Sequence, residues 1–240
     1  MKKINLFGFG ILFSILILSC SSEGESTSDS TSLILPKKTN FIENSDYDII
    51  GQDTYITYNG NKIVSEITED QWKNVFTYTG DFITKIESYD YGELYETIDY
   101  TYLNGKLASR FKRNIDGQSS TSYLTNYTHN PDGTVSYSSK YGKGILTFKN
   151  GNLINDGENT YEYDNKNNPF NNILGISVLS IDRDTETAIY NVSKNNCTKT
   201  KGNELTNHDI TYNSNGYPTL DKEYYDGETT GYGSYKYYYF

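Results

Sequence analysis

Short runs in which apolar and polar residues alternate recur from residue 53 onward. In the run 97–102, Ile98, Tyr100 and Tyr102 alternate with threonine and aspartate residues. Successive side chains of a β-strand point to opposite faces, so these three side chains share one face and the polar ones share the other. The run predicts a strand that packs on one face and meets water on the other.

Turn signals separate these runs. Asn59-Gly60 and Asn104-Gly105 supply the Asn-Gly pair that tight hairpin turns favour, because both residue types adopt positive φ at low cost. Asn130-Pro131-Asp132-Gly133 is typical of a turn followed by a bulge. Each turn and its flanking runs predict a β-hairpin. The predicted hairpin units are residues 53–67, 75–89, 97–111, 124–138, 145–155, 159–170 and 208–224.

The hairpin units together predict an all-β fold. Their turn glycines are unevenly spaced, which favours an antiparallel meander of β-hairpins over a solenoid with a strict period. No segment keeps a helical period of 3.6 residues. At ordinary strand lengths the chain has room for about 12–15 strands. We expect this sheet to be curled or closed into a barrel, because twist accumulates and open edges promote aggregation.

The first twenty residues follow a different pattern. Lys2 and Lys3 precede an apolar run over residues 4–18, which is too short to span a bilayer and is typical of a signal peptide. Ser19 followed by Cys20 resembles the lipobox of bacterial lipoproteins. The resemblance implies cleavage before Cys20 and a diacylglyceryl group on its sulfur. Ordinary cleavage with an incidental cysteine is the alternative.

Composition changes again after Cys20, which predicts three parts of the chain. Residues 1–19 are the predicted lipoprotein signal peptide. Residues 20–45 are the predicted lipidated tether, because they begin with small, polar and acidic residues that favour a flexible chain. Residues 46–240 are the predicted single β domain. Two or three acyl chains would hold such a protein in the outer membrane without a spanning helix.

Two short patterns in the tether bear on location. Glu23 and Glu25 resemble the export tag that carries lipoproteins to the cell surface in one Gram-negative lineage. Asp29-Ser30-Thr31 resembles the O-glycosylation motif of that lineage, which implies a glycan on Ser30. An ordinary solvated linker is the alternative for both patterns.

Charge and cysteine content limit the partners and the covalent stabilisation. The formal net charge is -10, so nucleic acid and anionic membrane surfaces would repel the protein. The remaining partner classes are a polysaccharide, another envelope protein, and the membrane through the lipid anchor. Cys20 and Cys197 are the two cysteines, so a lipidated Cys20 leaves no disulfide within the chain.

Tyrosine is the residue type that most needs an explanation, with 25 copies against 10 phenylalanines and 1 tryptophan. Tyrosine packs across strands through its ring and reaches polar partners through its hydroxyl. An exposed aromatic platform that stacks on sugar rings is the functional alternative. The last strand is the predicted place for it, since aromatics occupy both of its faces. The candidate stacking residues are Tyr232, Tyr235, Tyr237, Tyr238 and Tyr239.

Motifs for catalysis or metal binding are scarce. His129 and His208 fit no metal or metalloprotease spacing, and the sequence has no nucleophile elbow or P-loop. Asp182, Asp184 and Glu186 alternate and suit either a calcium site or a solvated strand face. We predict no cofactor, no metal and no catalytic residue. The many carboxylates leave a glycan hydrolase with an Asp/Glu pair as an alternative.

Family resemblances support a barrel. The unit Tyr-x-Tyr-x-(Asn/Asp)-Gly resembles the YD repeats of RHS-type proteins. The segments 161–164, 167–170, 210–213 and 216–218 are similar to repeat lipoproteins of the Gram-negative envelope, some with a domain of unknown function described as porin-like. This resemblance implies a barrel-like sheet and no assigned activity. Phe240 with Tyr238 also resembles the C-terminal signal of outer-membrane barrels, which implies an inserted barrel.

These observations favour a non-enzymatic outer-membrane lipoprotein. Its tyrosine-rich β domain would face the cell surface or the periplasm and bind a glycan, another polymer or a partner protein. Glycan hydrolysis and a purely structural role as an envelope scaffold are the two alternatives.

Overall fold

The computed structural model describes residues 33–44, 49–116, 119–183, 192–202, 205–225 and 233–240. Its regular elements are sixteen strands and one short 3₁₀ helix, η1. The described part of the chain has no helix long and apolar enough to cross a membrane. The elements are β1 Pro36–Asn44, β2 Ile49–Asn59, β3 Lys62–Thr68, β4 Lys73–Thr79, β5 Phe82–Asp90, β6 Glu93–Leu103, β7 Lys106–Asp116, β8 Ser119–His129, β9 Val135–Ser139, β10 Gly142–Lys149, β11 Asn152–Asn155, β12 Thr160–Tyr163, η1 Ile176–Ile181, β13 Cys197–Lys201, β14 Leu205–Tyr212, β15 Pro218–Tyr225 and β16 Gly233–Tyr239.

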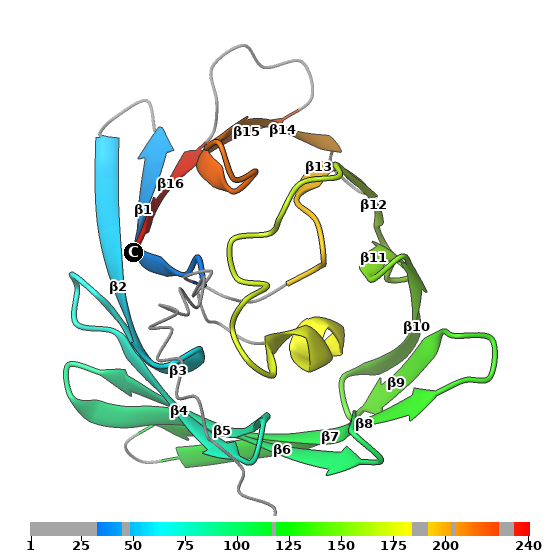
Figure 1. The fold of residues 1–240 in the computed structure, drawn as a ribbon. Coiled ribbons are helices and arrows are strands. Elements are labelled where there is room, and N and C mark those ends of the chain that lie inside the picture. The colour runs from blue at the N-terminus through cyan, green and yellow to red at the C-terminus, as the bar shows by residue number, and fades with distance from the viewer. Residues whose placement is uncertain (1–32, 45–48, 117–118, 184–191, 203–204, 226–232) are drawn as a thin grey trace, which may run out of the picture. The chain divides into compact units, whose positions relative to one another are not determined.

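The strands form one closed barrel (Figure 1). Each strand pairs antiparallel with its neighbours in sequence, and β1 pairs with β16 to close the ring. The predicted all-β antiparallel meander that closes into a barrel is confirmed, with sixteen strands in place of the expected 12–15. One of the added strands is β1, which begins at Pro36 within the predicted tether, so the barrel starts before residue 46.

The barrel has two distinct ends, because successive connections of an antiparallel meander alternate between them. The tight turns that contain Gly60, Gly80, Gly105 and Gly133 share one end, which we call the turn end. The connections at the opposite end include residues 69–72 between β3 and β4, and we call it the loop end. β1 begins at the turn end, where Pro36 pairs with Tyr239.

The side chains that face the lumen change character from one end to the other. Ile63, Ile83 and Leu107 follow directly after tight turns and are fully buried. Farther along β3 and β7, the lumen-facing positions are Glu66 and Lys112, which are also buried. The lumen is therefore apolar at the turn end and polar toward the loop end.

Tyrosines beside the turns account for much of the tyrosine content. They project into the lumen and donate hydrogen bonds to backbone carbonyls of the neighbouring strand or, for Tyr78, of the segment between β12 and β13. Burial raises the pKa of Tyr78 and Tyr163 to about 12, because an ionised phenolate would lose its hydration there. Packing with a satisfied hydroxyl is thus one use of the repeated tyrosine. The donor and acceptor pairs are Tyr58 to Pro36 at 2.8 Å, Tyr78 to Leu174 at 3.0 Å, Tyr102 to Ile83 at 2.6 Å, Tyr163 to Leu153 at 2.7 Å and Tyr239 to Pro218 at 2.7 Å.

A segment between β12 and β13 fills the turn half of the lumen. We call residues 164–183 and 192–196 the plug, and Figure 1 shows its η1 helix inside the ring of strands. The prediction of a hairpin over residues 159–170 is therefore wrong beyond β12. Apolar side chains explain the inward path, because they are buried against the lumen face of the wall. These side chains are Phe170, Ile173, Ile176, Leu179 and Ile181.

Gly175 lets the plug meet the wall. It has φ 77°, and a Cβ atom at this position would lie 2.5 Å from the carbonyl oxygen of Asp81 in the β4–β5 turn. The backbone N–H of the preceding Leu174 donates to the carbonyl of Asn61 at 2.9 Å. Only glycine satisfies both the left-handed conformation and the close approach without strain.

The outer wall carries ion pairs. Lys85 and Glu87 lie 2.6 Å apart on β5, and Lys38 and Asp53 lie 2.8 Å apart across β1 and β2. Transmembrane barrels present an apolar band to lipid, where a lysine or arginine costs about 2–4 kcal/mol at the bilayer midplane. This wall opposes the inserted barrel that the C-terminal resemblance of Phe240 implied.

Candidate functional site

The loop half of the lumen contains an aromatic pocket between β1–β4 and β16. It has a volume of 300 Å³. Phe41, Trp72 and Tyr235 supply aromatic rings, and Glu66, Asp70 and Asn74 supply polar groups. We use the name aromatic pocket for the space that these six residues share.

Short-range contacts position the aromatic rings. The ring centroids of Phe41 and Tyr235 lie 4.6 Å apart across the β1–β16 pair that closes the barrel. Trp72 sits in the β3–β4 connection, where its backbone N–H donates to Thr68 Oγ1 at 3.1 Å. Its indole packs edge to face against Tyr95 at 5.2 Å. These contacts hold three aromatic rings from distant parts of the sequence around one space.

The polar side of the aromatic pocket is also ordered before any ligand arrives. Asn74 Nδ2 donates to Glu66 Oε1 at 2.7 Å, and both side chains are buried. Asp70 accepts a hydrogen bond from the hydroxyl of Thr68. The pocket thus offers carboxylate acceptors beside apolar ring faces. That combination suits a ligand with hydroxyl groups on a compact carbon ring, because the ring packs on aromatics and its hydroxyls donate to carboxylates.

A second loop-end space, the charged pocket, has a volume of 340 Å³ and is lined in part by Arg110, Tyr123 and Asp182. Arg110 and Asp182 form an ion pair at 3.5 Å with both side chains almost completely buried. Tyr100 donates to Asp182 Oδ2 at 2.7 Å, and burial raises its pKa well above the usual value. The pair joins the plug to the barrel wall.

This geometry bears on the calcium alternative for Asp182, Asp184 and Glu186. Asp182 is neither solvated nor on a strand, since Arg110 and Tyr100 hold its carboxylate. Asp184 and Glu186 lie outside the described residues. Within the described ranges, no group of three or more His, Cys, Asp or Glu residues is placed to hold a metal ion.

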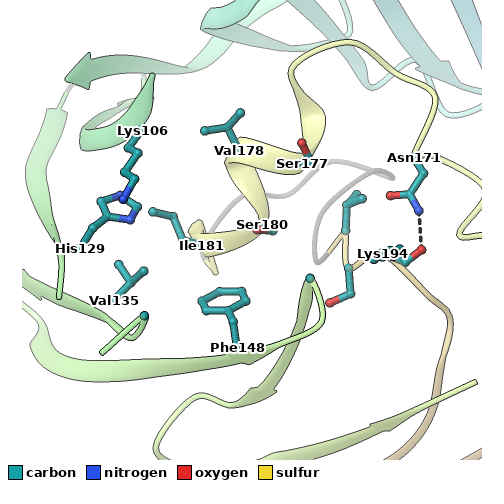
Figure 2. Close-up of a pocket in the computed structure, with 14 residues that line it drawn as sticks. Lys106, His129, Val135, Phe148, Asn171, Ser177, Val178, Ser180, Ile181 and Lys194 are labelled. Atoms are coloured by element: carbon teal, nitrogen blue, oxygen red, sulfur yellow. Dashed lines mark hydrogen bonds between the residues drawn. The ribbon is translucent and has the colours of Figure 1, made fainter. Parts of the chain in front are cut away.

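A third space, the apolar pocket, lies at the turn end and has a volume of 520 Å³. Figure 2 shows η1 residues Val178 and Ile181 on one side and the wall residues Val135 and Phe148 on the other. Ile181 also lines the charged pocket, so the plug separates the two spaces.

The candidate stacking tyrosines lie on different surfaces. Tyr237 faces the lumen, 6.3 Å from the ring of Phe170, and Tyr239 is also turned inward. Tyr238 lies on the outer wall with Lys38 Nζ 4.6 Å from its ring centroid. Tyr235 lines the aromatic pocket, whereas Tyr232 lies outside the described residues, as do Cys20 and Ser30. The described terminal tyrosines therefore do not form one continuous platform.

A titratable cluster lies on β14 and β15 in the lumen. His208 Nδ1 lies 3.0 Å from Asp221 Oδ1. Burial alone would lower the pKa of His208, but the hydrogen bond and charge of Asp221, with the charge of Glu223, raise it above 6.5. Burial raises the pKa of Glu223, and also that of the Cys197 thiol. A raised thiol pKa disfavours the reactive thiolate.

Comparison with known proteins adds little. No protein-family model matches the chain. No curated protein sequence matches it either. The crystal structure of a porin-like protein from Bacteroides uniformis ATCC 8492 aligns with 85% of this chain and 98% of that one, at 12% identity and a TM-score of 0.40. Similarity this weak supports no conclusion about function, and the resemblances to YD repeats and envelope lipoproteins stay predictions.

Proposed function

We propose that the protein is an outer-membrane lipoprotein, anchored through Cys20, whose barrel binds a glycan chain in the aromatic pocket. The proposal rests on one observation: three aromatic residues and the carboxylate of Glu66 line the same pocket. The aromatic residues are Phe41, Trp72 and Tyr235. The described chain enters the barrel at the turn end, and the aromatic pocket lies at the opposite end.

Binding would use the pocket as it stands. Sugar rings would pack on the faces of Trp72 and Tyr235, and sugar hydroxyls would donate to Glu66 and Asp70. The buried hydrogen bond from Asn74 fixes the Glu66 carboxylate in advance, which lowers the entropy lost on binding. The absence of a catalytic motif in the sequence supports binding without turnover.

Trp72 makes the proposal directly testable, because it is the single tryptophan of the chain. Its fluorescence should change when soluble oligosaccharides from a broad panel are titrated into the protein. Tyr235→Ala should weaken binding about twofold to tenfold, the usual contribution of an aromatic contact. Tyr238→Ala is the matched control, since it removes a tyrosine of the same strand from the outer wall. Unchanged emission with every glycan, or equal losses for both variants, would contradict the proposal.

Hydrolysis is a second candidate because Glu66 and Asp70 line the same pocket. Glycans that change Trp72 emission should be incubated with the protein and assayed for new reducing ends. Glu66→Gln and Asp70→Asn would abolish release of reducing ends if these carboxylates act as acid and base. Binding with no release of reducing ends supports the non-enzymatic proposal.

The anchor and its orientation have separate tests. Cys20→Ala should move the protein from the membrane fraction to the soluble fraction, and continued membrane retention would remove the lipid anchor from the proposal. Protease added to intact cells should digest the barrel if Glu23 and Glu25 direct it to the surface. Mass spectrometry of the wild type and Ser30→Ala should differ by the mass of a glycan if Ser30 is modified.

A further inference from the structure

We propose that the apolar pocket at the turn end binds one free fatty acid, with the acyl chain inside and the carboxylate toward the exposed lysines of the lining, Lys106 and Lys194. This inference does not depend on glycan binding, which concerns the other end of the lumen.

The pocket has the volume and lining for an acyl chain. Its 520 Å³ lie within the range of sites for one small molecule, which favours a single chain over a two-chain phospholipid. Val135, Phe148, Val178 and Ile181 surround the space in Figure 2. A peptide would bring backbone N–H and C=O groups that such side chains leave unsatisfied. An acyl chain has no polar group except at its end.

The charges of the lining favour an acid as that end group. Lys106 and Lys194 are both exposed and belong to the turn end. Among the fourteen described residues that line the pocket, none is Asp or Glu, although the chain has 31 acidic residues against 21 basic ones. The lining of the pocket thus carries positive charge only, on a protein that is acidic overall. Lysine stems also pack along apolar surface while the ammonium group stays in water.

Two polar side chains of the lining, His129 and Asn171, have partners within the protein. His129 Nε2 lies 2.9 Å from the carbonyl of Leu107 and donates its N–H there. The Asn171 side chain donates to the carbonyl of Lys194, as the dashed line in Figure 2 shows. The backbone N–H of Lys194 donates to the carbonyl of Gly151 at 3.1 Å, which fixes this lysine beside the β10–β11 turn.

The test uses the full chain with Cys20→Ala, purified without detergent so that no amphiphile competes. cis-Parinaric acid serves as the fluorescent probe, and saturated fatty acids of increasing length displace it. Affinity should rise about fourfold per added methylene until the pocket is full. The corresponding fatty alcohols should bind about threefold to fivefold more weakly, because they lack the charge that exposed lysines attract.

Two sets of variants separate the lysines from the cavity. Lys106→Glu combined with Lys194→Glu should abolish the preference for acid over alcohol. Lys222→Glu, which reverses an exposed lysine on β15, should leave that preference intact. Val178→Phe should fill the cavity and abolish binding of the probe, with Trp72 emission as the check that the barrel stays folded.

Several results would overturn the proposal. Equal binding of acids and alcohols by the parent chain would mean that the lysines recognise no anion. Tighter binding of a two-chain phosphatidic acid than of any fatty acid would assign the site to a phospholipid. Failure of every amphiphile to bind the probe site would leave the cavity without this role. A change in Trp72 emission with glycans would be unaffected by any of these results, so the two proposals fail independently.

Discussion

The two halves of the lumen are built from the same strands and differ in almost every other respect. At the turn end, Ile63, Ile83 and Leu107 pack against the plug and leave one apolar pocket. Toward the loop end, the same three strands carry Glu66, Ser88 and Lys112 into the lumen. Hairpin alternation decides which face a side chain occupies, whereas distance from the turn decides how polar its surroundings are.

This difference separates stability from binding. In the turn half, the wall and the plug bury apolar side chains against each other, and apolar burial is the main favourable term in folding. The loop half keeps charged and aromatic groups in a lumen that is only partly filled. Its buried charges are therefore paired with one another, as in Lys112 and Glu96 at 2.6 Å. Breaking contacts at the boundary between the halves is the most direct way to test the contrast.

Asp182→Ala should have the largest effect on stability, a loss of about 3–5 kcal/mol, because the Arg110 guanidinium stays buried without this carboxylate. Tyr100→Phe is the matched variant, since it removes one hydrogen bond to the charged Asp182 and should cost about 1.5–3 kcal/mol. Urea denaturation measures both. Similar losses for the two variants would mean that the ion pair does not hold the plug at the boundary.

Gly175→Ala should rank next, with a loss of about 2–3 kcal/mol, of which about 1–2 kcal/mol reflects the left-handed backbone. The rest arises where the new Cβ meets the carbonyl of Asp81 at 2.5 Å. Gly60→Ala provides the control, because Gly60 has φ 63° and nothing within 4 Å of a Cβ. Thermal or urea unfolding should therefore separate the two variants, and equal losses would contradict the close contact between plug and wall.

The smallest effect should be a difference in pH dependence between the ends. His208 and Glu223 have raised pKa values in the fold, so their stabilisation is complete below the unfolded values and is lost as pH rises. The free energy of unfolding should fall above pH 6.5 for His208 and above pH 4.5 for Glu223. His208→Gln and Glu223→Gln should each remove the corresponding part of that fall.

Asp132 at the turn end provides the opposite sign. A hydrogen bond from the Thr134 hydroxyl lowers the pKa of Asp132 below 3.8, so its contribution is present above that value and is lost as pH falls. Asp132→Asn should change the acid limb of the stability curve and leave the alkaline limb unchanged. If the free energy of unfolding still falls at rising pH in the double variant His208→Gln, Glu223→Gln, other titrating groups cause that fall.

The sequence predicts the wall better than the contents of the lumen. Alternation and Asn-Gly turns suffice for the barrel because each hairpin is a local structure. The plug escaped prediction because residues 159–164 repeat the hairpin pattern before the chain turns inward. A signal was present nonetheless, since Phe170, Ile173, Ile176 and Leu179 are spaced by three residues, a period that suits 3₁₀ turns and no strand.

The sequence did not predict the aromatic pocket, although one of its residues, Tyr235, was a candidate for stacking on sugar rings. Alternation places this residue on one face of the last strand, but the register between β1 and β16 brings it to Phe41. Trp72 joins them from a connection between two other strands. The contact between Phe41 and Tyr235 depends on the pairing of β1 with β16 that closes the barrel, and no local sequence pattern specifies this pairing.

Closure by β1 and β16 also has a consequence for folding. The two strands stand at opposite ends of the described chain, so the barrel cannot close until the last of them has been synthesised. Until then, two unpaired sheet edges remain open to other chains, and contacts of such long sequence separation form slowly.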